Sequence, residues 1–178
     1  WEHNWPECDL YAEVIELRLW LGFERRVWIQ NTRPEFQPQL DDAPYRRSKE
    51  YHWTVSGRAR PGDLVLMYRA GTASEARKWD ADAEMLQSIA NVFIVKSRPW
   101  RDKRWGYQAE VAHVALLKYP LRLGQLKTDA VLKGAPFIRA SMLGRWDVTP
   151  YWYRFHNLIA RLNPTIARRL ARFAPNKV

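Results

Sequence analysis

Apolar and polar residues in the first two thirds of the chain predict a series of short strands. Two nearly continuous apolar runs have the length of buried strands, residues 63–69 and 88–97 ("SIANVFIVKS"). A shorter strand is predicted at 26–30 ("RVWIQ"), and 107–117 ("YQAEVAHVALL") alternates as an antiparallel return strand does. A tight turn, Pro61-Gly62-Asp63, introduces the first of the two buried runs.

The segment before these strands fits two interpretations. Apolar residues alternate with the intervening positions from 15 to 23, as in a half-buried strand. The same segment also forms a helical stripe, capped by Asp9, that runs through Leu10, Val14, Leu17 and Leu21. We favour a strand over 14–21, and the helix remains the alternative.

Three segments lack regular periodicity and are predicted as connections. Residues 32–50 hold three prolines, so we expect mostly loop with one helical turn. Residues 72–87 are polar and long for a connection, which favours an exposed insertion or mobile loop. Residues 98–107 ("RPWRDKRWGY") are predicted to form a basic loop that carries two tryptophans.

The C-terminal third predicts helices. "YPLRLGQLKTD" gives a strand end followed by a short helix, and Thr149-Pro150 and Asn163-Pro164 each place an N-cap before a proline at the first helical position. These pairs predict helices over 150–161 and 164–173. The second helix has an inward stripe of Ile166, Leu170 and Phe173, with Arg168, Arg169 and Arg172 on its other face.

Together these elements predict an α+β fold. We expect a small, mostly antiparallel sheet of five or six strands, closed or nearly closed into a barrel, with flanking helices. A length of 178 residues supports one domain with a real core. The chain begins at Trp1, so we expect a domain cut from a larger protein.

Composition limits the kinds of site and the cellular compartment that we expect for the protein. The single cysteine, Cys8, excludes a disulfide framework and a cysteine-based zinc site, and fits a reducing compartment. No apolar run has the length of a membrane span and the start has no signal-peptide pattern, so we expect a cytoplasmic protein with no membrane partner.

Charge and tryptophan content point to nucleic acid. The formal net charge is +10, and ten tryptophans are far above ordinary usage. A basic surface binds phosphates, and exposed tryptophans stack on bases. Basic charge can also serve solubility alone, and tryptophan can be core, but the two features together favour a nucleic-acid partner.

The sequence offers little that predicts catalysis. The four histidines, His3, His52, His113 and His156, have no metal-ligand spacing, and the acidic run 80–84 lacks the rest of a calcium loop. The glycines match neither the P-loop nor the dinucleotide-binding spacing. We therefore predict a binding module that is not an enzyme and has no cofactor and no metal. An enzyme that uses His52 or His113 with a carboxylate is the alternative.

Tryptophans beside arginines mark the candidate site. Trp53 precedes the Pro-Gly-Asp turn, Trp100 and Trp105 share the basic loop, and Trp146 follows Arg145. Because loop backbones are usually solvated, such tryptophans suit base stacking, although they can also cover an open end of a barrel. We predict that the neighbouring cations grip phosphates: Arg98, Arg101, Lys103, Arg104 and Arg145.

The order of segments closely resembles that of the EVE domain, a member of the PUA-like superfamily alongside the YTH readers of methylated adenine. The segments are "PGDLVLMY" (61–68), "IANVFIVKS" (89–97), "YQAEVAHV" (107–114), "PLRLGQLK" (120–127) and "RWDVTP" (145–150). The resemblance implies an N-terminal extension at 1–25, a PUA-like barrel domain at 26–162, and a basic C-terminal helix and tail at 163–178. Arg69-Ala70-Gly71 and the long acidic insertion 72–87 depart from the family's usual pattern.

The resemblance also implies a pocket, lined by aromatic side chains, that accepts a modified base. Trp53 takes the place of a cage tryptophan, and the 98–107 loop supplies a second wall. We expect the base-binding residues to be Trp53, Thr54, Ser56, Tyr68, Arg69, Trp100 and Trp105.

The hypothesis is a reader of methylated or hydroxymethylated cytosine in DNA, which serves as the specificity domain of a modification-dependent restriction or defence protein. Such a protein would carry a fused nuclease or NTPase domain. The alternatives are a reader of modified RNA, such as methylated adenine, a base-acting enzyme, and a domain whose tryptophans bind a protein partner.

Overall fold

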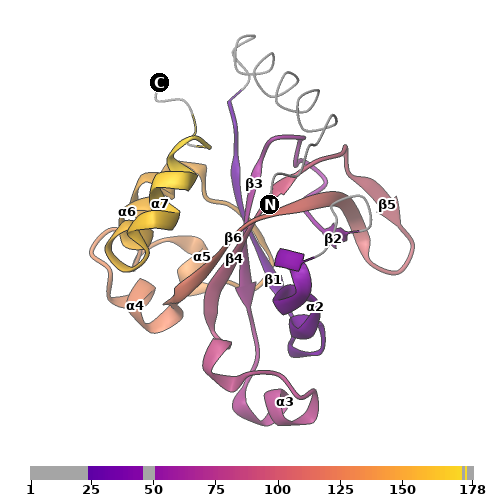
Figure 1. The fold of residues 1–178 in the computed structure, drawn as a ribbon, viewed down its shortest axis with the longest axis horizontal. Coiled ribbons are helices and arrows are strands. Elements are labelled where there is room, and N and C mark those ends of the chain that lie inside the picture. The colour runs from indigo at the N-terminus through magenta and orange to yellow at the C-terminus, as the bar shows by residue number, and fades with distance from the viewer. Residues whose placement is uncertain (1–23, 46–50, 174, 176–178) are drawn as a thin grey trace.

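The structure is a computed structural model, and it describes residues 24–45, 51–173 and 175 (Figure 1). The choice between strand and helix at 14–21, and nearly all of the expected N-terminal extension, therefore lie outside the described residues.

The described residues form one curled, mixed sheet. Its strands are β1 (Val27–Thr32), β2 (His52–Thr54), β3 (Leu64–Arg69), β4 (Ser88–Val95), β5 (Trp100–Asp102), β6 (Gly106–Arg122) and β7 (Arg145–Asp147). The strand order is β2-β6-β4-β3-β1-β7, with β5 paired to β6 at the side. Strands β1 and β3 run parallel, and the other pairs are antiparallel. The sheet curls into a half-barrel (Figure 1), which confirms the α+β class and a barrel-like fold.

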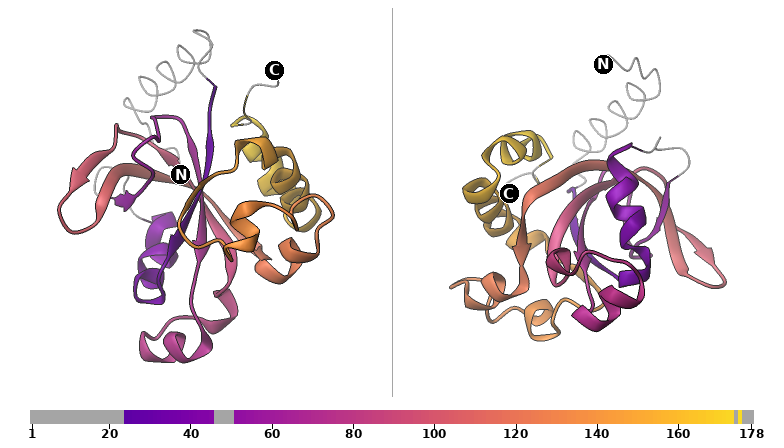
Figure 2. Two further views of the ribbon diagram at one scale, coloured as in Figure 1. Left: turned by 180° about the vertical axis from the view of Figure 1, so that it is seen from behind. Right: turned by 60° about the horizontal axis from the view of Figure 1, so that its bottom comes forward.

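Each face of the sheet packs against its own hydrophobic cluster. Along β3, Leu64, Leu66 and Tyr68 belong to one cluster, while Val65 and Met67 belong to the other. The first cluster is covered by α4 (Leu123–Thr128), α5 (Pro136–Arg139), α6 (Trp152–Leu162) and α7 (Pro164–Ala171). The second lies under α2 (Gln37–Asp42), on the opposite side of the sheet (Figure 2). Strands at the centre of the sheet are thus buried on both faces.

The Pro61-Gly62-Asp63 turn locks the start of β3 to β1. Gly62 has φ +93°, which a residue with a side chain rarely adopts. The fully buried Asp63 carboxylate accepts hydrogen bonds from the backbone N–H of Arg26 (3.0 Å), the indole Nε1–H of Trp28 (3.0 Å) and the backbone N–H of Arg60 (2.9 Å). This carboxylate therefore sets the parallel register of the two strands.

The predicted strands are confirmed, but the predicted connections hold more structure than expected. Residues 32–50 contain α2 between two 3-10 turns, Pro34–Phe36 and Ala43–Tyr45, because the prolines stand in first turns, where no N–H is needed. The insertion 72–87 contains α3 (Ala73–Lys78), which begins with a capping box between Thr72 and Glu75. The basic loop 98–107 is a hairpin formed by β5 and the start of β6.

The two C-terminal helices are confirmed, and Asn163 is the N-cap of α7 with Pro164 at the first position, although its side chain makes no capping hydrogen bond. The predicted Thr149 cap is wrong, because Thr149 lies inside the 3-10 turn Thr149–Tyr151 that precedes α6. The Thr149 hydroxyl donates to Asp147 (2.6 Å) and accepts from the N–H of Val27 (3.0 Å), so it ties β1 to β7. The Asn163 side chain exchanges two hydrogen bonds with the backbone of Tyr119, which pins the α6–α7 corner to β6. The inward stripe of α7 is confirmed by the complete burial of Leu170.

Candidate functional site

A pocket of about 420 Å³ lies where the two ends of the curled sheet face each other. One side comes from β2 and the β5–β6 hairpin, and the other from β1 and β7. Its lining residues are Gln30, Asn31, Thr32, Arg33, Phe36, Gln39, His52, Trp53, Thr54, Trp105, Gln108 and Arg145. The pocket therefore occupies the opening that a half-barrel leaves between its ends.

Three aromatic side chains form a connected wall in this pocket, which we call the aromatic wall: Trp53, Phe36 and Trp105. Trp53 is 7% exposed, stacks on Tyr51 (5.7 Å between centroids, 21°) and meets the edge of Phe36 (6.4 Å, 85°). Phe36 in turn meets Trp105 edge to face (5.5 Å, 83°). Trp105 is 37% exposed and carries the Arg104 guanidinium over its ring at 4.7 Å. An inner and an outer tryptophan thus share one phenylalanine.

The remaining lining is rich in amides. Gln30 donates its Nε2–H to the backbone oxygen of Asn31 (3.0 Å), but its Oε1 is buried without a hydrogen-bond partner. The Asn31 side-chain oxygen accepts a hydrogen bond from the backbone N–H of Gly144 (3.0 Å), and the backbone N–H of Asn31 donates to the carbonyl of Gly144 (3.3 Å). These two bonds hold the turn before β7 against β1. A buried acceptor left unpaired costs about 1–3 kcal/mol, and Gln30 keeps one that no described protein group uses.

The pocket mouth carries positive charge. The Arg145 guanidinium, from β7, lies 3.6–3.8 Å from the position that a Cβ on Gly106 would take, so it reaches the hairpin across the mouth. Arg33 is exposed and pairs with Glu35 at 3.7 Å. Among the described lining residues none carries a carboxylate. The pocket and its mouth are thus set up for a neutral or anionic ligand.

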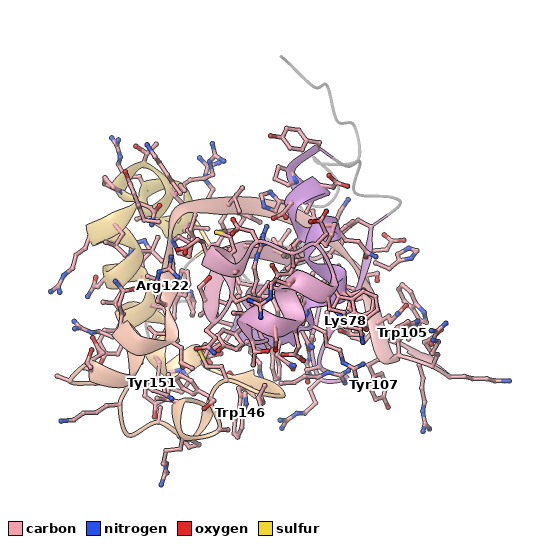
Figure 3. All side chains as sticks on the ribbon, turned by 90° about the horizontal axis from the view of Figure 1, so that it is seen from below. Lys78, Trp105, Tyr107, Arg122, Trp146 and Tyr151 are labelled. Carbon is pink, nitrogen blue, oxygen red and sulfur yellow. The ribbon has the colours of Figure 1, made fainter. Side chains whose placement is uncertain are left out.

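The hairpin presents the predicted phosphate-gripping residues to solvent. Arg98, Arg101, Lys103 and Arg104 are all exposed, and Asp102 shapes the turn by accepting from the N–H groups of Arg104 (2.7 Å) and Trp105 (2.8 Å). Trp105 lies at the hairpin side of the molecule, well away from Arg122 on the helical side (Figure 3).

Trp100 and Ser56 were also predicted as base-binding residues, but neither lines the pocket. Trp100 is 38% exposed and packs edge-on against His52 (5.2 Å, 88°), outside the lining. Ser56 also lies outside, where its hydroxyl accepts from the N–H of Arg58 (3.2 Å). Trp53, Thr54 and Trp105 are the predicted residues that the structure brings together in the pocket.

The placement of Tyr68 and Arg69 at a pocket mouth is wrong. Tyr68 faces the helical cluster, and burial raises the pKa of its hydroxyl to about 12. Arg69 is 0% exposed and donates to Asp41 (2.7 Å) and Asn91 (2.9 Å). Both residues end a strand, but β3 lies between β1 and β4 near the middle of the sheet, so its ends are buried as well.

Arg69 instead anchors the helix that carries part of the pocket. Its ion pair with Asp41 holds α2 to the sheet, and Gln39 of the same helix lines the pocket. Asn91 extends the network to His113, 3.4 Å away. Burial, together with the nearby Arg169, lowers the pKa of His113 to about 4. His113 is therefore neutral at ordinary pH and does not line the pocket.

Phe36, Gln30 and Arg33 were missed by the sequence analysis. Phe36 falls in a segment whose three prolines predicted a loop. Gln30 ends a predicted strand, and nothing in the sequence indicates that its side chain lines a pocket.

The described residues contain no group of three or more His, Cys, Asp or Glu side chains placed to hold a metal ion. Among them there is also no helix of the length and apolar character that crossing a membrane requires.

Comparisons with known proteins relate the chain to solved structures alone. No family model matches it, and no curated protein matches it. A hypothetical protein from Leishmania major has a TM-score of 0.55 at 18% identity, over 79% of this chain and 96% of that one. A protein from Pseudomonas putida has a TM-score of 0.54 at 18% identity, over 75% and 98%. A protein from Rhodopseudomonas palustris has a TM-score of 0.50 at 14% identity, over 81% and 92%. What these chains share is the fold.

Proposed function

We propose that the protein is a binding module that captures a modified nucleobase in the pocket between β2 and β7. The observation that carries the proposal is the aromatic wall of Trp53, Phe36 and Trp105, set beside amide side chains and below a cationic mouth. The half-barrel and the segments that resemble EVE domains support a PUA-like assignment, and with it this use of the pocket.

The pocket chemistry suits a flat heterocycle. Its volume of about 420 Å³ is within the usual range for small-ligand sites. A base stacked on a tryptophan gains roughly 1–3 kcal/mol, and an enzyme or reader must first extrude the base from its stack. The Gln30 oxygen has no partner but is buried, so rotation of the Gln30 side chain toward the pocket would let it accept from the exocyclic amino group of cytosine or adenine, which donates a hydrogen bond.

The cations around the mouth suit the flanking phosphates. Arg145 crosses the mouth, and the hairpin adds four exposed cations, Arg98, Arg101, Lys103 and Arg104. Contacts of this kind position a nucleic acid without reading its sequence. We favour methylated or hydroxymethylated cytosine in DNA, with a nuclease or NTPase domain as the fused effector of a restriction or defence protein.

Modified RNA, including methylated adenine, is the second candidate, because the Gln30 acceptor suits the amino group of adenine as well. A base-acting enzyme has less support. His52 is the histidine of the pocket lining, and no carboxylate stands among the described lining residues to act with it.

The test is a binding screen at one fixed salt concentration. Matched DNA duplexes, DNA single strands and RNA strands would carry unmodified or modified cytosine or adenine, and fluorescence anisotropy would report affinity. We expect one modified base to bind at least several-fold more tightly than its unmodified partner. Equal affinity for every modified and unmodified pair would contradict the proposal.

A further inference from the structure

The helical side of the molecule carries much of the chain's positive charge. Between residues 131 and 173 the sequence holds eight Lys or Arg residues and one acidic residue, Asp147, whereas the whole chain has a net charge of +10. Of these cations, Arg145 belongs to the pocket mouth and Arg154 pairs with Asp129. Helices α5, α6 and α7 come from this segment and cover the face of the sheet opposite α2, as Figures 1 and 2 show. This charge lies mainly on a different surface from the pocket and its hairpin.

Four arginines on this side form what we call the α6–α7 arginine face: Arg161, Arg168, Arg169 and Arg172. All four are exposed, and among the described residues none of them pairs with a carboxylate. Arg168 and Arg172 stand one helical turn apart, so their guanidinium groups share a side of α7. Arg169 reaches the carbonyl of Val114 on β6 at 3.5 Å. Like charges one helical turn apart repel each other modestly in water, and a bound anion removes that repulsion.

The chemistry of the face favours phosphates over a lipid surface. A helix that lies in a membrane interface needs an exposed apolar face. The apolar side of α7 is already used, because Ala167 and Leu170 are buried in the core and Phe173 packs against it. The guanidinium fork also matches two phosphate oxygens at once, which an ammonium group does not.

We propose that the α6–α7 arginine face is a second phosphate-binding surface, which contacts the nucleic-acid backbone without regard to sequence or modification. It lies on the other face of the sheet from the pocket and is independent of the proposed base capture. Its contribution is non-specific affinity, which a basic surface supplies through counterion release.

A pair of double variants tests this surface. Arg168→Gln/Arg172→Gln removes two charges from α7 and leaves its buried stripe intact. Arg77→Gln/Lys78→Gln is the matched control, since these two exposed cations on α3 lie outside both the pocket lining and the arginine face. Arg168→Lys/Arg172→Lys keeps the charge and tests whether charge is the cause.

The measurement is affinity for an unmodified duplex of DNA, for its modified counterpart and for a duplex of RNA, between about 50 and 200 mM salt. Vesicles containing phosphatidylserine are tested beside them. We expect the α7 glutamine variant to lower the slope of log affinity against log salt by about two, and the lysine variant to restore most of it. We expect the control variant to match the wild type, and the ratio of modified to unmodified affinity to stay unchanged in every variant. The RNA arm shows which backbone is preferred.

A wild-type slope in the α7 glutamine variant, on both DNA and RNA, would overturn the proposal. So would a variant that loses binding only to vesicles containing phosphatidylserine, because the partner would then be a membrane. Thermal melting checks the fold, and Arg161→Gln/Arg169→Gln repeats the test if the first pair unfolds. A wild-type protein without any modified-base preference would contradict the proposed function and leave this surface standing.

Discussion

Trp105→Ala removes the outer member of the aromatic wall while leaving the core of the protein in place. Trp105 is 37% exposed, and its ring packs edge to face against the half-buried ring of Phe36 at 5.5 Å. Loss of that contact should cost the free protein about 0.5–1.5 kcal/mol of stability. Loss of a stacking face for the base should cost roughly 1–3 kcal/mol of binding energy, or about a tenfold to hundredfold drop in affinity for the modified site.

The assay compares Trp105→Ala with Trp79→Ala by anisotropy on modified and unmodified duplexes. Trp79 is 43% exposed at the end of α3 and does not line the pocket, so it matches Trp105 in size and exposure. We expect Trp105→Ala to lose the preference for the modified base and to keep its non-specific binding, because phosphate contacts supply that binding. Trp79→Ala should behave as wild type.

The inner tryptophan requires a milder change. Trp53 is 7% exposed, and replacing a core tryptophan with alanine typically costs about 3–5 kcal/mol. Trp53→Phe keeps most of the packing and reduces the stacking area.

A Trp105→Ala protein that melts normally and retains the full preference for the modified base would refute the assignment of the aromatic wall.

Three other predictions concern the rim, the interior and the turn. Arg101→Ala should weaken modified and unmodified sites alike and reduce the salt slope by about one in the same titration; a changed base preference with an intact slope would mean that Arg101 reads the base. His113 has its pKa lowered from 6.5 to about 4, so the unfolded chain takes up the proton first and stability should fall as pH drops from about 6.5 to 4. Urea unfolding at several pH values should show that His113→Gln removes this part of the decline, and an identical decline in both proteins would contradict it. Asp63→Asn should cost about 2–4 kcal/mol in urea unfolding, because an amide cannot accept all three hydrogen bonds that the carboxylate accepts, and a loss below about 0.5 kcal/mol would show that the turn does not depend on them.

The periodicity of the sequence predicted the strands and helices themselves better than it predicted which strands pair in the sheet. The runs that became β3 and β4 are buried on both faces, so continuous apolar residues mark them, and the stripe of α7 is visible because one side of that helix meets the core. The parallel pairing of β1 with β3 has no local signal, because it depends on contacts between segments far apart in the chain.

The site residues likewise divide into those that the sequence could predict and those that depend on strand order and register. Trp53 and Trp105 could be proposed from composition and flanking charge, but Tyr68 and Arg69 could not be excluded, because strand order decides whether the end of a strand is exposed. Trp100 and Trp105 could not be distinguished, since the hairpin register puts Trp100 opposite Gln108 and Trp105 in the turn. Phe36 enters the pocket from a turn that its sequence made resemble a loop.

The most direct test of the pocket is an NMR titration that follows the indole N–H signals of the tryptophans and the side-chain amides. A short DNA carrying the modified base that binds best would be added to the protein, and its unmodified counterpart would be the control. We predict that the signals of Trp53, Trp105 and the Gln30 amide shift with the modified DNA and that the signal of Trp79 does not. Unchanged signals of Trp53, Trp105 and Gln30 at a DNA concentration that saturates binding would contradict base capture in this pocket.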